Sequence, residues 1–329
     1  MRKALVLGVN GQDGGYLAQS LVQRGYAVTG VGRQLASRYA DTGTGYRYVR
    51  LDLADHDALD QLLRDAEPEI VFHVAAVHGA AGFGYEACWR DMMAVNVLAL
   101  HALLEHARAR QPAMRIMYAG SAKIFPAPWS GVLSETTPYR ATCLYSIGKI
   151  ASLELIAHYR RQHKVTAANL ILFNHDSARR KPEYFVPTVA RALAAALADP
   201  AARTEFRMLD FWMDWSAADE VMDIAIDIAE QAPDQDFVLA TGKTWHARAA
   251  VAAIFARHGL DYRNHIVETL PRSDPGPAFQ VAVDRVERVI GRRPVASIAE
   301  IVESILVIDA ERRPIGSAPA APSPITQVR

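Results

Sequence analysis

The chain has 329 residues, half of them apolar, and its 36 basic residues balance 36 acidic ones. A chain of this size can bury a large core, as one large domain or as a large and a small one. Because the charge is balanced and there is no basic stripe or tail, nothing indicates a nucleic-acid partner. The two cysteines, Cys88 and Cys143, form no CxxC pair and show no metal-ligand spacing, so we expect no metal site and no structural disulfide.

The first apolar run, residues 3–8, is too short for a signal peptide or a membrane span. We therefore predict a buried first β-strand and a soluble, cytoplasmic protein without a membrane partner. A glycine turn follows, and then an amphipathic helix at 16–24. A glycine turn between a strand and a helix lets the backbone approach a pyrophosphate, although tight-turn chemistry alone is the simpler alternative. The residues expected to contact a dinucleotide here are Gly8, Asn10, Gly11, Gln12, Asp13 and Gly14.

A second strand, predicted at 27–32, ends in Arg33. Enzymes that prefer NAD usually place an acidic residue there to bind the ribose 2′-hydroxyl, whereas an arginine suits a 2′-phosphate. We therefore predict NADP(H) as the cofactor, with Arg38 as a second phosphate contact. The alternative is an ordinary exposed arginine at the end of a strand.

Further strands are predicted at 46–51, 69–74, 114–119 and 167–173, with long helices at 85–109 and 145–163. This alternation predicts an α/β fold, a Rossmann-type doubly wound parallel sheet. Four residues that follow strands are expected to contact the cofactor: Asp52, Leu53, Ala75 and Ala76. His78, a little further on, either faces the ligand or is an ordinary loop histidine.

The alternation becomes looser beyond residue 172. We predict an NADP(H)-binding domain at 1–172, a smaller substrate-binding lobe at 173–312 that is interleaved with the last sheet strands, and a disordered tail at 313–329. The elements predicted in the lobe are helices at 186–198, 217–230, 247–258 and 298–308 and short strands at 206–209 and 237–240.

Tyr145 and Lys149 are four residues apart, so on a helix they project from the same face. A lysine beside a phenol favours the phenolate and lowers its pKa, which suits proton transfer to or from a substrate hydroxyl. A solvated surface pair is the alternative. Ser121 directly follows the strand at 114–119, at the edge of the sheet where such folds bind ligands.

Together, these motifs resemble the extended short-chain dehydrogenase/reductase family. More narrowly, residues 9–33, 170–180 and 209–221 are similar to stretches of GDP-mannose 4,6-dehydratases. The resemblance implies that Tyr145 is the acid/base, that Lys149 binds the nicotinamide ribose and that Ser121 binds the sugar hydroxyl. It also implies cofactor contacts from Phe173 and His175 and substrate contacts from Asn174, Arg179, Arg180 and His78.

The chain departs from the dehydratases at three positions. Lys123 stands where they carry the glutamate that performs dehydration, and an ammonium is a poor base unless burial lowers its pKa. Residues 121–126 look closer to the corresponding run of GDP-L-fucose synthase, whose cysteine and histidine are absent here. Met213 and Val189 replace an arginine and a lysine at the nucleotide end.

We therefore expect an enzyme, an NADP(H)-dependent oxidoreductase that acts at C4 of a nucleotide-activated sugar, with ketoreduction as the leading version. The alternatives are a 4,6-dehydratase, with Lys123 bringing different proton chemistry, an epimerase, and a non-catalytic cofactor-binding protein. By the same resemblance we expect a homodimer or tetramer that pairs through the helices at 87–109 and 145–162.

Overall fold

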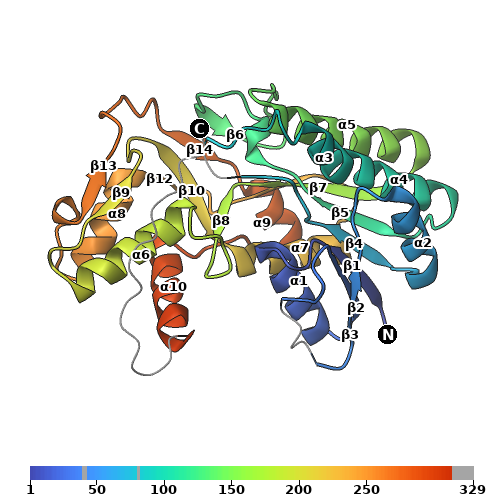
Figure 1. Ribbon diagram of the computed structural model, residues 1–329. Helices are drawn as coiled ribbons and strands as arrows, with labels where there is room; N and C mark the ends of the chain where they lie inside the picture. The colour runs from blue at the N-terminus through green and yellow to red at the C-terminus, as the bar shows by residue number, and fades with distance from the viewer. Residues whose placement is uncertain (39–42, 80–81, 313–329) are drawn as a thin grey trace.

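The computed structural model describes residues 1–38, 43–79 and 82–312 (Figure 1). A seven-stranded sheet lies at its centre, in the order β11-β7-β5-β4-β1-β2-β3, and every pairing in it is parallel. Its strands are β1 (Lys3–Leu7), β2 (Ala27–Gly32), β3 (Tyr46–Arg50), β4 (Ile70–His73), β5 (Arg115–Ala119), β7 (Thr166–Leu172) and β11 (Phe237–Leu239). This is the predicted Rossmann-type fold.

The sheet reverses its winding direction between β1 and β4. From β1 the chain proceeds outward through β2 and β3, then returns to β4 on the other side of β1 and continues outward through β5. The loops that follow β1 and β4 therefore leave in opposite directions, which opens a crevice at the carboxyl ends of these strands.

Both faces of the sheet are covered by helices, which is why its strands read as continuous apolar runs. Val6 packs with α1 (Gln12–Gln23) and α7 (Ala218–Gln231), whereas Leu5 and Leu7 pack on the opposite face with α2 (His56–Ala66) and α4 (Ala99–Ala109). The long helix α5 (Leu144–His163) lies beside α4 on that second face (Figure 1).

Most of the remaining elements form a lobe beside the carboxyl ends of the strands (Figure 1). Its core surrounds Trp215 and is built mainly by helices α6 (Phe185–Ala198), α8 (Ala247–Arg257) and α10 (Ile298–Arg312). Its small sheets contain β8 (Asn174–Asp176), β10 (Trp212–Ala217) and β12 (Thr244–His246), β9 (Thr204–Phe206) with β13 (Ile266–Glu268), and β6 (Gly131–Leu133) with β14 (Phe279–Val281). The domain boundary at residue 172 stays a prediction, while α7 and β11, which follow it, belong to the layers of the main sheet.

Several predicted elements differ from those observed. The helix expected at 85–109 starts only with α3 (Trp89–Met93), continues as a π-helical segment, Ala94–Leu98, and ends as α4. Residues 85–88 form a turn because Tyr85 packs against Tyr145, and the Cys88 N–H donates to the Tyr85 carbonyl at 3.2 Å.

The first helix begins at Gln12, four residues before the predicted start, and the strand expected at 206–209 is β9, at 204–206. Helices α2 and α9 (Asp284–Ile290) were not predicted. The predicted tail at 313–329 lies outside the described residues. No described helix has the length and apolar character needed to cross a membrane.

Candidate active site

Tyr145 and Lys149 lie on the first turns of α5 and are almost fully buried, with 6% and 2% of their surfaces exposed. The Lys149 Nζ lies 5.5 Å from the centre of the Tyr145 ring. Ser121 follows β5, close enough to Tyr145 for its hydroxyl to lower the pKa of the phenol. The structure therefore brings together three residues that the sequence placed on two separate segments.

Lys149 is held by the end of β5. Its ammonium donates to the Ala119 carbonyl at 2.6 Å and to the Tyr118 hydroxyl at 3.1 Å. Burial lowers the pKa of Lys149 to about 7, although the negative charge of Asp13 opposes this change. Asp13 lies in the first turn of α1, directly after the glycine turn, so this helix N-terminus and the Tyr–Lys pair are close enough to interact electrostatically.

The pKa of Tyr145 is raised well above its usual value. Burial is the main cause, and the neighbouring Tyr118 and Tyr85 add to it, while the Ser121 hydroxyl and the charge of Arg180 act in the opposite direction. This is opposite to the lowering predicted from Lys149, because burial outweighs nearby positive charge. Tyr145 is therefore a neutral phenol at neutral pH.

A buried hydrogen-bond network behind Lys149 begins in the π-helical segment. The Asn96 carbonyl accepts from the Tyr118 hydroxyl at 2.8 Å and from the Ser152 hydroxyl at 3.2 Å. A π-helical turn disrupts the normal helical ladder, and such turns are frequent at functional sites. The Asn96 side chain also accepts from the Val77 N–H at 2.9 Å. We did not predict this network; a polar asparagine on an otherwise apolar helical face was its one signal in the sequence.

The glycine turn packs tightly against the loop that follows β4. Gly8 has φ +95°, and a Cβ at this position would lie 2.7 Å from the Ala75 Cα. Helix α1 starts directly after Gly11 with no side chain capping its N–H groups. A helix N-terminus with uncapped N–H groups and a close-packed glycine turn suits a pyrophosphate. Ala76 follows Ala75 in the same loop.

Asp13 and His175 form a buried pair at 3.0 Å. The other ring nitrogen of His175 lies 2.8 Å from the Phe173 carbonyl, so both nitrogens face acceptors and both carry protons. The pKa values agree with this pairing: against the effect of burial, Asp13 raises that of His175, and His175 lowers that of Asp13 to about 2. The buried Gln12 amide donates to the His175 carbonyl at 3.1 Å. The two ring nitrogens of His175 are thus already bonded to protein groups.

A hollow of about 450 Å³ lies at the ends of β2 and β3. It is lined by Arg33, Arg50, Leu51 and Asp52. The Arg50 Nε donates to the Arg33 carbonyl at 3.2 Å, which holds the Arg50 side chain beside Arg33. The sequence indicates Arg33 but not Arg50, because strand pairing brings the two together across 17 positions. Leu53, which follows Asp52, is buried.

Asn10 holds the loop beyond Arg33. Its amide donates to the Gln34 side chain at 2.8 Å and accepts from the Arg38 N–H at 2.7 Å. Arg38 is therefore tied to the glycine turn through its backbone, and its side chain is exposed.

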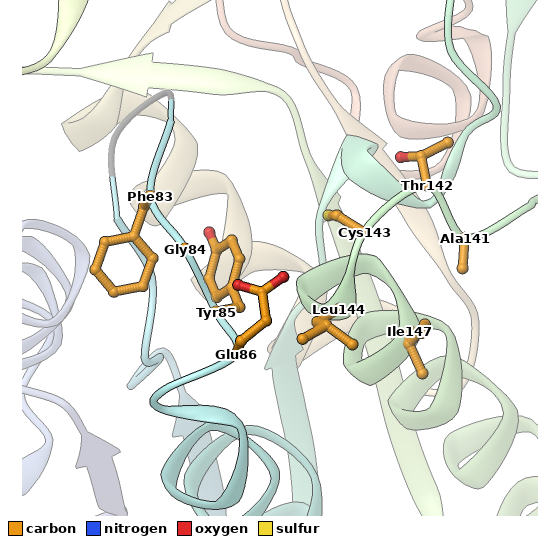
Figure 2. A pocket seen from close by; sticks show the side chains of 9 residues that line it. All are labelled: Phe83, Gly84, Tyr85, Glu86, Ala141, Thr142, Cys143, Leu144 and Ile147. Carbon is orange, nitrogen blue, oxygen red and sulfur yellow. The ribbon is translucent and has the colours of Figure 1, made fainter. Parts of the chain in front are cut away.

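A cavity of about 500 Å³ lies beside Tyr145, at the start of α5. Figure 2 shows Tyr85 and Glu86 on one side of it and Cys143, Leu144 and Ile147 on the other. The Tyr85 ring also stacks on that of Tyr145, with centroids 5.5 Å apart. Tyr85, which the sequence did not single out, therefore separates this cavity from Tyr145.

Three further predicted residues lie at the crevice. Lys123 is exposed on a 3₁₀ turn, Ala122–Ile124, and its N–H donates to the Ser121 hydroxyl at 3.2 Å. Asn174 is exposed on β8. The His78 ring meets the Tyr145 ring edge-to-face, with centroids 4.7 Å apart.

Other predicted residues point elsewhere or pack into cores. The Phe173 side chain is 2% exposed and packs against Trp129 and Phe279. The Arg179 guanidinium lies over the Tyr16 ring on α1, at 3.9 Å, and that of Arg180 lies over the Tyr184 ring at 3.8 Å.

The two residues that replace a lysine and an arginine of the dehydratases differ from each other in burial. Val189 is a fully buried core residue, whereas Met213 is half-buried on β10.

Comparisons with known proteins agree with this geometry. A family model described as GDP-mannose 4,6 dehydratase matches residues 5–288. GDP-mannose 4,6 dehydratase 2 from Caenorhabditis elegans is 30% identical to the chain, in an alignment that covers 93% of the chain and 88% of the relative. GDP-mannose 4,6-dehydratase from Vibrio cholerae is 27% identical, with 85% and 80% covered.

Two solved structures share the fold. dTDP-glucose 4,6-dehydratase from Bacillus anthracis, in complex with NAD, superposes with a TM-score of 0.79 at 13% identity, covering 95% of this chain and 97% of that one. UDP-glucose 4-epimerase from Thermotoga maritima, with UDP-glucose, gives 0.78 at 16% identity, covering 94% and 99%. The chain therefore belongs to the GDP-mannose 4,6-dehydratase family of extended short-chain dehydrogenases/reductases.

Proposed function

We propose that this protein is an NADP(H)-dependent oxidoreductase that reduces the 4-keto group of a nucleotide-activated sugar. The observation that carries the proposal is the group of Ser121, Tyr145 and Lys149 at the carboxyl end of β5, in which Tyr145 and Lys149 are buried and the charge of Asp13, in the first turn of α1, acts on Lys149. The relatives named above act on nucleotide sugars according to their names, which supports this substrate class.

Each residue has a role that the family resemblance implies and its position supports. When bound, the reduced nicotinamide supplies a hydride to the carbonyl carbon. The Tyr145 phenol gives its proton to the carbonyl oxygen as that oxygen gains charge, and the Ser121 hydroxyl donates a hydrogen bond to it. Lys149, fixed by Ala119 and Tyr118, binds the nicotinamide ribose. Because burial keeps Tyr145 protonated, it suits the acid that ketoreduction requires.

The choice of NADP(H) over NAD(H) is supported by Arg33 and Arg50, which line one hollow. Two guanidinium groups suit a 2′-phosphate by charge and by planar donors. We expect Arg33→Ser and Arg50→Ser each to weaken NADPH binding about 10- to 100-fold, the loss of one charged hydrogen bond, and to leave NADH binding unchanged. Arg47→Ser, on β3 but outside the hollow, is the matched control. Titration calorimetry tests this, and equal effects on both cofactors would overturn the choice.

A 4,6-dehydratase is the second candidate, because the family match spans most of the chain. Against it, Lys123 occupies the position of the dehydratase glutamate. Two nearby carboxylates are already paired and so do not replace that glutamate as a base: Asp13 pairs with His175, and Asp176 pairs with Arg180.

The products decide between these functions. The protein would be incubated with NADPH and a panel of nucleotide sugars and their 4-keto derivatives, and the products weighed by mass spectrometry. A gain of two hydrogens with stoichiometric NADPH consumption supports ketoreduction. Loss of one water without net cofactor change supports the dehydratase, an unchanged mass with an altered product supports an epimerase, and no turnover across the panel supports the non-catalytic alternative.

We also propose that the protein is a homodimer. Leu98 in the π-helical segment and Ile147 on α5 remain 47% and 43% exposed, on the elements through which pairing is expected. Light scattering should give twice the chain mass for the wild type and a smaller mass for Ile147→Asp. A wild-type monomer would overturn this proposal.

A further inference from the structure

His78 joins the catalytic tyrosine to the second lobe. Its ring meets that of Tyr145 at 61°, and its Nδ1 lies 3.1 Å from the Tyr184 hydroxyl. Tyr184 directly precedes α6, 106 residues further along the chain. This hydrogen bond therefore closes one side of the crevice from two distant segments.

The partners of Tyr184 determine which nitrogen of His78 carries the proton. The Arg180 guanidinium, 3.8 Å from the centre of the Tyr184 ring, withdraws electron density and makes the phenol a better donor. Burial raises the pKa of Tyr184, so its proton is retained. Among the residues that the structure describes, His78 Nδ1 is the one hydrogen-bond partner of this hydroxyl. These features favour donation from the Tyr184 O–H to Nδ1.

His78 itself is neutral. Burial lowers its pKa to about 3, and the positive charges of Arg180, Lys149, Lys123 and His175 act in the same direction. A neutral imidazole has one N–H, so with Nδ1 as the acceptor that proton lies on Nε2. Within the described part of the chain Nε2 has no partner, yet it is not among the enclosed polar atoms, so solvent reaches it.

We propose that His78 is a catalytic residue that donates a hydrogen bond from Nε2–H to a sugar oxygen beside the phenol of Tyr145, and that Tyr184 is the positioning residue that fixes this tautomer. The proposal rests on the proposed function. A neutral donor fits this site because Lys149, Lys123 and Arg180 would repel a further cation. It also makes the site selective, because a deoxy or amino sugar at that position leaves the donor without an acceptor.

The tautomer can be measured without any substrate. Protein labelled with ¹⁵N-histidine would be studied by NMR of the ring nitrogens between pH 5 and 8, with the His78 signals assigned by their loss in His78→Gln. We expect a protonated Nε2, an unprotonated Nδ1 and no titration over this range. Tyr184→Phe, which keeps the ring under Arg180, should give mixed tautomers. A proton on Nδ1, titration of His78 in this range, or an unchanged tautomer in Tyr184→Phe would overturn the proposal.

Activity provides the second test, with two amides of different reach. The side-chain nitrogen of Gln extends to about the position of Nε2, whereas that of Asn reaches only that of Nδ1. With NADPH and the 4-keto sugar that the wild type reduces, His78→Asn should lose about 10- to 100-fold in kcat/KM, and His78→Gln should recover most of this loss.

His258→Gln, whose imidazole bonds Glu303 in the second lobe, is the control and should match the wild type. Equal losses in the two His78 variants, with unchanged thermal melting, would overturn the role of Nε2–H. If the wild type reduces nothing in the panel, the proposed function fails, while the NMR result still decides the tautomer.

Discussion

Burial sets the protonation of the two ionisable groups at the centre of the site. Tyr145 keeps its proton and Lys149 loses part of its charge near neutral pH, because both are removed from water. A ribose bound at Lys149 would thus meet an amine that is partly neutral.

We expect Tyr145→Phe to lower kcat about 10²- to 10⁴-fold, the usual contribution of a positioned proton donor. NADPH affinity should stay within a few-fold, because the ring and its contacts with Tyr85 and His78 remain. Stopped-flow absorbance and calorimetry measure the two quantities, and Tyr139→Phe, at an exposed position, is the control. Full activity in Tyr145→Phe would contradict every catalytic version of the proposal.

The depressed pKa of Lys149 predicts how stability depends on pH. Between about 7 and the unfolded value of 10.5, the unfolded chain binds one proton more at this residue than the native one. The free energy of unfolding therefore rises with pH in this window, and this contribution is lost as pH falls from 10.5 to 7. At 1.36 kcal/mol per pKa unit, it amounts to roughly 4–5 kcal/mol.

Lys149→Met removes this dependence. The difference in the free energy of unfolding between wild type and variant, measured in urea at pH 7 and pH 10, should shift in favour of the wild type as pH rises. A difference that is constant across this range would show that Lys149 stays fully charged in the native protein.

At the scale of the element, the glycine turn combines backbone strain with close packing. Gly8→Ala would meet both a positive φ and the Ala75 backbone, whereas Gly25→Ala, with φ +81° and nothing within 4 Å, would meet the strain alone. We expect Gly25→Ala to cost about 1–2 kcal/mol, and Gly8→Ala to cost more and to abolish NADPH binding. Urea unfolding and calorimetry test this. Equal losses of unfolding free energy in the two variants would show that the contact between residue 8 and Ala75 is relieved by small shifts of the backbone.

The π-helical segment depends on Asn96. In Asn96→Ala the Val77 N–H loses its acceptor, which should cost about 1–3 kcal/mol. Asn96→Asp, which keeps an acceptor oxygen, should lose less. Urea unfolding of both variants measures this, and a fully stable Asn96→Ala would show that the segment is held by packing alone.

At the scale of the whole molecule, two elements beyond residue 172 complete the layers of the main sheet. β11 pairs with β7, and α7 packs against α1 over the same core as Val6. We therefore expect a fragment of residues 1–172 to lack a fixed tertiary structure, because one face of the sheet loses most of its cover. Near-UV circular dichroism and NMR dispersion test this. A well-dispersed spectrum would show that the first 172 residues form an independent domain.

The sequence predicted the strands of the main sheet and the lobe helices α6, α8 and α10 well, and the short strands of the lobe poorly. Apolar runs such as residues 3–8 and 167–173 are long and buried on both faces, so the pattern reveals them. The short strands β6, β12, β13 and β14 have three residues each, too few for a period to be read. The long helix at 85–109 was only partly right, since no local pattern reveals a π-helical turn.

By itself, the sequence determined the doubly wound fold, the glycine turn and the one-turn spacing of Tyr145 and Lys149, because periodicity and spacing are local properties of the chain. Only the tertiary structure decided the protonation of those two residues, the pairing of Arg33 with Arg50 and the hydrogen bond between Tyr184 and His78. These depend on burial and on partners distant along the chain, and a one-dimensional pattern contains neither.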